Sequence, residues 1–162
     1  SAARALSGAK YRNAGQICVA PTRFLVQEGV YDAFLESFVG HARAIKVGDG
    51  MEADTTMGPL ANRRRLEAIE RLVADAVDKG GKVEAGGRRV GNKGCFFEPT
   101  VITGVTPQMA AMNEEPFGPV ALVQPFGTLD EAVSEANRLA YGLAASSKPT
   151  CLATASKAEW SR

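Results

Sequence analysis

The sequence predicts an α/β fold, with a mostly parallel sheet whose strands are joined by crossover helices. Short apolar segments alternate along its 162 residues with helical segments of ten or more residues. Strands separated by a helix of that length are joined by crossover connections, which place neighbouring strands parallel. Neither an internal repeat nor a low-complexity linker interrupts the alternation, so we expect one α/β unit.

Hydrophobic periodicity places the elements of the first half of the chain. Residues 2–11 are rich in alanine, leucine, lysine and arginine, which favour a helix. Residues 22–27 form an apolar segment typical of a strand. Apolar side chains recur at helical spacing over residues 30–45 and again over 66–77, so both segments are predicted to be amphipathic helices. Residues 46–60 contain three glycines and a proline, which indicates a loop.

The second half continues the alternation, with two local signals that define elements. Thr128 precedes a helical segment and Glu131 follows three residues later, which is the signature of a capping box. Pro99 interrupts a strand-like segment, which predicts an edge strand or a bend because proline cannot donate to a sheet ladder. The expected elements are a strand at 82–85, a turn-rich segment at 86–94, strands at 96–102 and 119–126, a helix from Thr128 to about Leu139, a short strand at 142–146, and the start of a helix within 149–162.

The charge balance and the cysteine count exclude several classes of function. Lysine and arginine total 19 against 18 aspartate and glutamate residues, so no long-range field favours a nucleic acid or an anionic membrane as a partner. No apolar run is long enough to span a bilayer. The three cysteines, Cys18, Cys95 and Cys151, are widely spaced and His41 is the only histidine, which argues against a metal site and a disulfide framework. We therefore expect a cytoplasmic protein in a reducing compartment, with no bound metal.

Cys18 is the first candidate for chemistry. It follows a glycine turn in the stretch from Asn13 to Arg23 and precedes the apolar run of the strand predicted at 22–27. A cysteine at such a junction can be exposed to a ligand and yet held rigidly, which suits a thiolate nucleophile. Free cysteine is more often an inert buried residue, so local chemistry leaves both interpretations open.

Several short motifs follow one another along the chain. The segment Arg-Asn-Ala-Gly-Gln-Ile-Cys occupies residues 12–18, Met-Gly-Pro-Leu occupies 57–60, and Asn-Glu-Glu-Pro-Phe-Gly-Pro occupies 113–119. Between the last two lie Gly-Gly at 86–87 and Phe-Glu-Pro-Thr at 97–100. In this order the motifs resemble those of the catalytic domain of the NAD(P)-dependent aldehyde dehydrogenases, and the resemblance covers nearly the whole chain.

The resemblance implies covalent catalysis by Cys18. Its thiolate would attack the aldehyde carbon, the thiohemiacetal would pass a hydride to the nicotinamide of NAD or NADP, and water would hydrolyse the thioester. The backbone N–H of Cys18 would donate to the developing oxyanion. Glu115 matches the family position that hydrogen-bonds the nicotinamide ribose, and Phe117 matches the residue that packs beside the nicotinamide. From the sequence pattern alone, Glu114 and Glu115 would be a solvated acidic pair and Phe117 would be a residue of the hydrophobic core. The flanking Phe-Gly-Pro segment favours cofactor binding for Glu115 and Phe117 instead.

Arg12, six residues before Cys18, bears on the choice of substrate. A guanidinium near the nucleophile can hold the far carboxylate of a semialdehyde through two hydrogen bonds. The motif around Arg12 is most similar to that of the succinate-semialdehyde dehydrogenase branch, which implies a small-molecule aldehyde that carries a carboxylate. Alternatively, Arg12 is a surface residue at the end of the first helix, where a cation is also favoured.

Parts of the family pattern are not found in residues 1–162. No glycine-rich turn between a strand and a helix is present to bind a dinucleotide pyrophosphate. The family's upstream glutamate base, its oxyanion asparagine and its oligomerisation segment are also missing. We therefore expect a partial catalytic domain with little or no dehydrogenase activity alone, whose parent protein is a homo-oligomer. Two alternatives stay open: an acylating enzyme that passes the acyl group to coenzyme A, and a truncated, non-catalytic structural or interaction domain.

Overall fold

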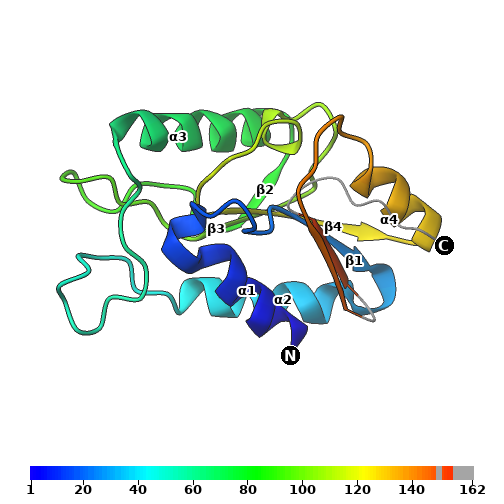
Figure 1. The fold of residues 1–162 in the computed structure, drawn as a ribbon, viewed down its shortest axis with the longest axis horizontal. Helices are drawn as coiled ribbons and strands as arrows, with labels where there is room; N and C mark the ends of the chain where they lie inside the picture. Colours follow the sequence, from blue (N-terminus) through cyan, green and yellow to red (C-terminus); the bar gives the residue numbers. More distant parts are fainter. Residues whose placement is uncertain (149–150, 155–162) are drawn as a thin grey trace.

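The computed structural model describes residues 1–148 and 151–154, and in this part of the chain six strands form one mixed sheet (Figure 1). The strand order is β2-β3-β4-β1-β6-β5. The central strands β3 (Thr100–Thr103), β4 (Val120–Phe126) and β1 (Arg23–Gln27) run parallel to one another. The α/β class and the parallel strands joined by crossover connections are thereby confirmed.

The flanking strands run antiparallel to their neighbours. At one side β2 (Lys82–Ala85) pairs with β3. At the other side β6 (Cys151–Thr154) pairs with β1, and β5 (Ala145–Lys148) pairs with β6. The antiparallel strands extend both sides of the parallel centre and complete its backbone hydrogen bonding.

Helices cover both faces of the sheet (Figure 1). On one face lie α1 (Ala2–Tyr11) and α2 (Tyr31–Arg43), which pack against each other. On the other face lie α3 (Arg63–Asp78) and α4 (Leu129–Ala136), which packs against the central strands β4 and β1. Because both faces are covered, the central strands are buried on both sides, as their continuous apolar sequence predicts.

Strand β1 shows how the core is assembled. Phe24 faces α2, where its ring centroid lies 4.9 Å from that of Phe38. Leu25 points to the opposite face, where it packs against Ala132 and Ala136 of α4. Successive side chains of a strand point to opposite faces, so this one strand anchors two helix layers directly after the cysteine segment.

The helix beginnings match the local signals in the sequence. Thr128 accepts a hydrogen bond from the Glu131 backbone N–H while the Glu131 side chain reaches back to the Thr128 backbone, so the predicted capping box is confirmed. Asn62 caps α3 by accepting from the Arg65 backbone N–H at 2.9 Å. The predicted extension of the last helix to Leu139 is wrong, because α4 ends at Ala136.

The expectations for the strand near Pro99 are corrected in one respect and confirmed in another. The predicted edge position at Pro99 is wrong, because β3 begins at the next residue and lies between β2 and β4. The predicted interruption is confirmed: Phe97 makes only an isolated bridge to Arg89 before the ladder begins at Thr100. Proline is tolerated there because it stands outside the ladder that it cannot donate to.

The end of the chain also differs from the prediction. The short strand expected at 142–146 is β5, which begins at Ala145 and ends at Lys148. The helix expected within 149–162 is wrong for Cys151–Thr154, which form β6 because they complete the backbone hydrogen bonds of β1. Residues 149–150 and 155–162 lie outside the described part of the chain.

Two features are absent from the described residues. None of their helices combines the length and apolar content needed to cross a bilayer. Within the same residues, no group of three or more histidine, cysteine, aspartate or glutamate side chains is arranged to hold a metal ion.

Candidate active site

The cysteine segment begins with a left-handed turn that follows α1. Asn13, Ala14 and Gly15 have φ angles of 50°, 53° and 72°. Only glycine adopts this conformation without a steric penalty, so Asn13 and Ala14 are held there by their surroundings. Ala14 is buried, and the Gln16 backbone N–H closes the turn by donating to the Asn13 carbonyl at 3.0 Å.

Cys18 lies in a second turn just after the first. The Ala20 backbone N–H donates to the Ile17 carbonyl at 2.9 Å, which places Cys18 inside the turn. The thiol is free and exposed, whereas Ala20 is buried and β1 begins at Arg23. The cysteine can therefore be reached by a ligand while the residues after it are fixed in the core, as a nucleophile requires.

Arg12 lies at the junction between α1 and this turn. Its side chain is exposed, and it occupies the C-cap position of the helix. No hydrogen bond or ion pair engages its guanidinium within the described residues. The structure therefore leaves the Arg12 cation available to a ligand on the same segment as Cys18.

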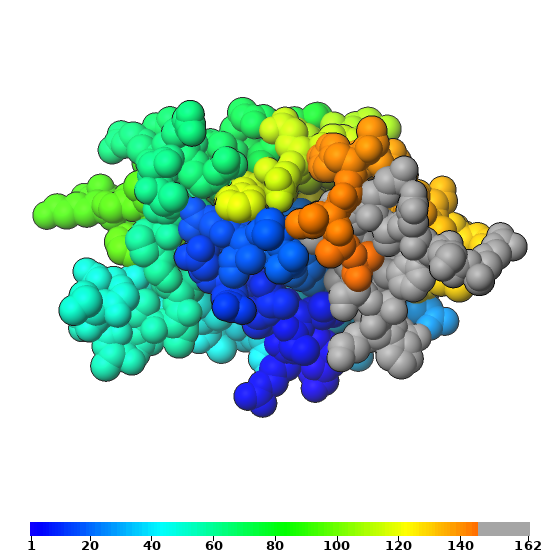
Figure 2. All heavy atoms as spheres, viewed as in Figure 1, coloured from blue at the N-terminus to red at the C-terminus, as the bar shows by residue number. Residues whose placement is uncertain are grey.

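The segment from Asn113 to Pro119 packs directly against the cysteine segment. A Cβ atom placed on Gly15 would lie 2.1 Å from the carbonyl oxygen of Gly118, so the two backbones touch where only glycine fits. Figure 2 shows the two segments side by side on one face, the first in blue and the second in yellow. Residues about one hundred positions apart in the sequence are thereby brought together.

Helix α3 supports the second segment from the other side. A Cβ atom on Gly118 would lie 2.3 Å from the Ile69 side chain. The Arg65 guanidinium donates to the Pro116 carbonyl at 3.0 Å. Phe117 lies between Pro116 and Gly118 in the chain, with a φ of 46° and a half-buried ring. The strained backbone at Phe117 is therefore held by contacts on both sides.

The two glutamates of this segment have different environments. Glu114 forms a two-point ion pair with Arg71, with Nη2 to Oε2 at 2.7 Å, and this contact lowers the pKa of Glu114. Glu115 is exposed, and no hydrogen bond engages its carboxylate within the described residues. The two carboxylates therefore differ: that of Glu114 is engaged by Arg71, whereas that of Glu115 is free to accept hydrogen bonds from a ligand.

A cavity of about 520 Å³ lies between the turn before Cys18, residues 59–65 and Phe117. Gln16 links the turn before Cys18 to residues 59–61. Its Oε1 accepts from the Ala61 backbone N–H at 2.8 Å, and its Nε2 donates to the Pro59 carbonyl at 3.4 Å. The cavity is lined by Asn13, Gln16, Pro59, Leu60, Ala61, Asn62, Arg64, Arg65 and Phe117.

Lys10 is buried beneath this site, with an exposed fraction of 1%. Burial lowers the pKa of Lys10 to about 7, and the negative charge of Glu115 acts in the opposite direction. Sequence reasoning missed this residue, although the helical period places Lys10 on the same buried side of α1 as Ala3 and Leu6.

A partly buried network of charged side chains contacts Asn113, two residues before Glu115. Arg138 donates to the Asn113 side chain at 2.7 Å and to Glu135 at 3.0 Å. Glu135 also pairs with the buried Arg23 at 3.1 Å. The network connects the strand that follows Cys18 to the residues that precede Glu115, and no local pattern in the sequence pointed to it.

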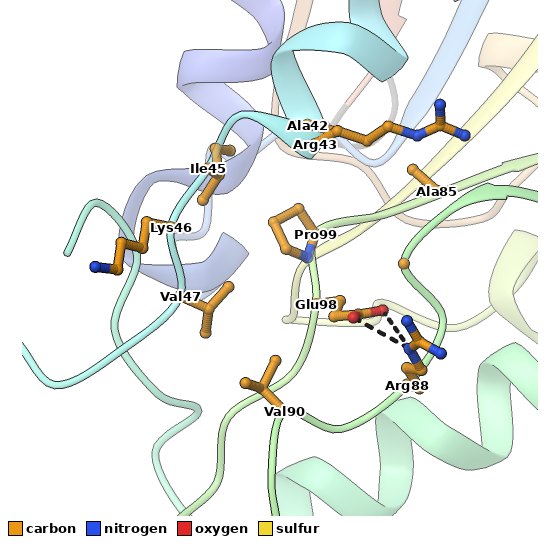
Figure 3. A pocket seen from close by; sticks show the side chains of 11 residues that line it. Ala42, Arg43, Ile45, Lys46, Val47, Ala85, Arg88, Val90, Glu98 and Pro99 are labelled. Carbon is orange, nitrogen blue, oxygen red and sulfur yellow. Dashed lines mark hydrogen bonds and ion pairs between the residues drawn. The ribbon is translucent and has the colours of Figure 1, made fainter. Parts of the chain in front are cut away.

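A second cavity, of about 470 Å³, lies between the end of α2 and the loop that follows β2 (Figure 3). It contains none of the candidate residues. Its cations are already engaged: Arg88 pairs with Glu98 at 3.1 Å, and Arg43 donates to the Glu84 carbonyl at 2.8 Å. The first cavity has one candidate residue, Phe117, in its wall and is therefore the better candidate for a ligand site, although Cys18, Arg12 and Glu115 do not line it.

Residues 1–158 match the aldehyde dehydrogenase family model, and the chain belongs to that family. It is 50% identical over 137 residues to a probable succinate-semialdehyde dehydrogenase (NADP(+)) from Sinorhizobium fredii, a match that covers 85% of this chain and 28% of that protein. It is 44% identical over 135 residues to a 3-sulfolactaldehyde dehydrogenase from Pseudomonas putida, covering 83% and 28%.

The fold agrees with a solved structure of the same family. A betaine aldehyde dehydrogenase from Staphylococcus aureus, determined in complex with NAD+, superposes with a TM-score of 0.83 at 38% identity, covering 88% of this chain and 29% of that one. The chain thus spans less than a third of the length of the relatives it matches.

Proposed function

We propose that this chain supplies the nucleophile and the nicotinamide-side contacts of an NAD(P)-dependent aldehyde dehydrogenase that oxidises a carboxy-semialdehyde, such as succinate semialdehyde, to the acid. The contact between Gly15 and Gly118 carries the proposal, because Gly15 lies three residues before Cys18 and Gly118 directly follows Phe117. Family membership supports the reaction class.

The chemistry follows from the side chains at this junction. The Cys18 thiolate forms a bond to the aldehyde carbon, and the backbone N–H of Cys18 donates to the oxygen that becomes negative. Bound NAD or NADP supplies the hydride acceptor. The free carboxylate of Glu115 suits the two hydroxyls of a ribose, because an ionised carboxylate only accepts hydrogen bonds. The half-buried ring of Phe117 offers an apolar surface beside them.

Arg12 supports an anionic substrate. Its exposed guanidinium has no partner in the described residues and lies on the segment that carries Cys18. Two relatives are named for aldehydes that carry a second, anionic group, a carboxylate in succinate semialdehyde and a sulfonate in sulfolactaldehyde. Arg12 would hold that group through paired hydrogen bonds.

The remaining parts of the proposal concern the whole protein. The chain alone oxidises no aldehyde with NAD(P) at an enzymatic rate, because the turn that binds the pyrophosphate and the base that activates water belong to other parts of the family pattern. The complete protein acts as a homo-oligomer in the cytoplasm, where exposed thiols such as Cys18 stay reduced.

Two alkylating reagents of similar size test the role of Arg12 on the isolated chain. Iodoacetate carries a carboxylate and iodoacetamide does not, so the ratio of their rates at Cys18 reports whether the Arg12 cation acts on an anion that reacts there. We expect Arg12→Gln to lower this ratio about fivefold, the effect of one opposite charge at contact distance, and high salt to reduce the difference. Rates are read per cysteine by mass spectrometry.

Arg4→Gln is the matched control, because it removes an exposed cation from α1 without changing the cysteine segment. Its ratio at Cys18 should equal that of the unmodified chain. An unchanged ratio in Arg12→Gln would remove the carboxylate-binding role and favour a surface role for Arg12.

A further inference from the structure

We propose that Gln16 is a positioning residue that fixes the Cys18 turn against residues 59–61. The inference rests on the proposed function of Cys18 and adds a residue to its machinery. Gln16 does not touch the reacting atoms. It acts through its hydrogen bonds to the backbone of Asn13 and of residues 59–61.

The side-chain amide of Gln16 is engaged at both ends. Its Oε1 accepts from the Ala61 backbone N–H at 2.8 Å. Its Nε2 donates to the Asn13 carbonyl at 3.1 Å and to the Pro59 carbonyl at 3.4 Å. The donors and the acceptor of one amide thus bridge two segments 43 residues or more apart in the sequence. A carboxylate could replace only the acceptor, and an apolar side chain neither.

The strained turn before Cys18 explains why such a bridge is needed. The left-handed backbone at Asn13 and Ala14 is unfavourable for residues with a side chain. The Asn13 carbonyl accepts from both the backbone and the side chain of Gln16, and the Asn13 side chain donates back to the Gln16 carbonyl at 3.3 Å. These bonds hold the turn closed and set the direction in which the chain continues to Cys18.

The hydrogen bonds of Gln16 also fix the orientation of the turn before Cys18, which packing alone does not fix. The contact between Gly15 and Gly118 brings two backbones together without any directional bond. Hydrogen bonds have preferred angles, so Gln16 fixes how the turn is rotated. Gln16 and Phe117 line the same cavity, and Cys18 follows Gln16 by two residues in the next turn, so the rotation of the first turn sets the direction in which the chain reaches Cys18.

Three variants of the full chain test the proposal with two measurements. Gln16→Leu removes both hydrogen-bonding ends, Gln16→Glu keeps the acceptor, and Gln27→Leu changes an exposed glutamine at the end of β1. Hydrogen exchange at the Ala61 and Ala20 amides reports the bridge and the Cys18 turn. The iodoacetate-to-iodoacetamide rate ratio at Cys18 reports the position of the thiolate relative to Arg12, which a purely structural role would not change.

We expect Gln16→Leu to exchange the Ala61 amide about tenfold faster, as loss of one backbone hydrogen bond to a side chain implies, and to lower the Cys18 ratio at least about twofold. Gln16→Glu should keep Ala61 protected but leave Ala20 less protected, because the bond to the Asn13 carbonyl is lost. Gln27→Leu should change neither measurement.

Two results would overturn the proposal: Gln16→Leu with both measurements unchanged, or with faster Ala61 exchange but an unchanged Cys18 ratio. A ratio at Cys18 that is insensitive to Arg12→Gln would instead count against the proposed function, and the exchange of Ala20 would then decide the role of Gln16.

Discussion

Replacing Gly15 by alanine is expected to force the cysteine segment away from the residues that follow Glu115 and to lower the free energy of unfolding by about 3 kcal/mol or more. The new Cβ atom would lie 2.1 Å from the Gly118 carbonyl oxygen and 2.6 Å from its carbon. Both are backbone atoms that cannot rotate away. The φ of 72° adds strain for any residue with a side chain.

Gly8→Ala is the matched control for this substitution. Gly8 lies inside α1, and a Cβ atom there meets nothing within 4 Å. Alanine should therefore raise stability by up to about 1 kcal/mol. Urea unfolding of both variants measures the difference, and a Gly15→Ala chain as stable as the unmodified one would contradict the close approach of the two segments.

Replacing Lys10 by methionine is expected to stabilise the chain at and below neutral pH and to remove a rise of stability with pH. Burial lowers the pKa of Lys10 to about 7 in the folded state, against 10.5 for the ordinary side chain. Between these values the unfolded chain holds a proton that the folded chain has released, so stability increases with pH. Below about pH 7 both states hold the proton, and the full cost of burying the cation remains.

In the unmodified chain, the free energy of unfolding should rise by on the order of 3 kcal/mol between about pH 7 and about pH 9.5. Measurements should stop there, because burial also raises the pKa of Tyr11, whose hydroxyl donates to the Thr100 carbonyl, so stability falls where unfolded tyrosine ionises. Urea unfolding at several pH values tests the expectation, with Lys93→Met as an exposed control. Equal pH profiles for Lys10→Met and Lys93→Met would show that Lys10 is not buried as a cation.

The helices and central strands could be predicted because their signals are local. The capping residue Thr128 and the apolar period of α3 act within one or two turns of the chain. Strand β6 could not be predicted in the same way, because its pairing with β1 depends on a partner more than one hundred residues away. The sequence pattern at 149–162 carried no information about that partner.

The candidate residues could be proposed from the sequence, but the contacts that bring their segments together could not. The motifs singled out Cys18, Glu115 and Phe117, but no periodicity reveals that Gly15 touches Gly118. Gln16 lies inside the cysteine motif, and its bonds to residues 59–61 appear only when the second motif, at 57–60, is brought beside the first.

The measurement that tests the central claim most directly is protection of Cys18 from iodoacetamide by two aldehydes of equal length. Succinate semialdehyde and butyraldehyde both form a thiohemiacetal with a thiol, but only the first carries a carboxylate for Arg12. We predict half-protection of Cys18 by succinate semialdehyde at a concentration about fivefold lower than by butyraldehyde, with no such preference at Cys95. Equal protection by the two aldehydes at Cys18, or the same preference at Cys95, would contradict the assignment of Cys18 as the nucleophile of a semialdehyde site.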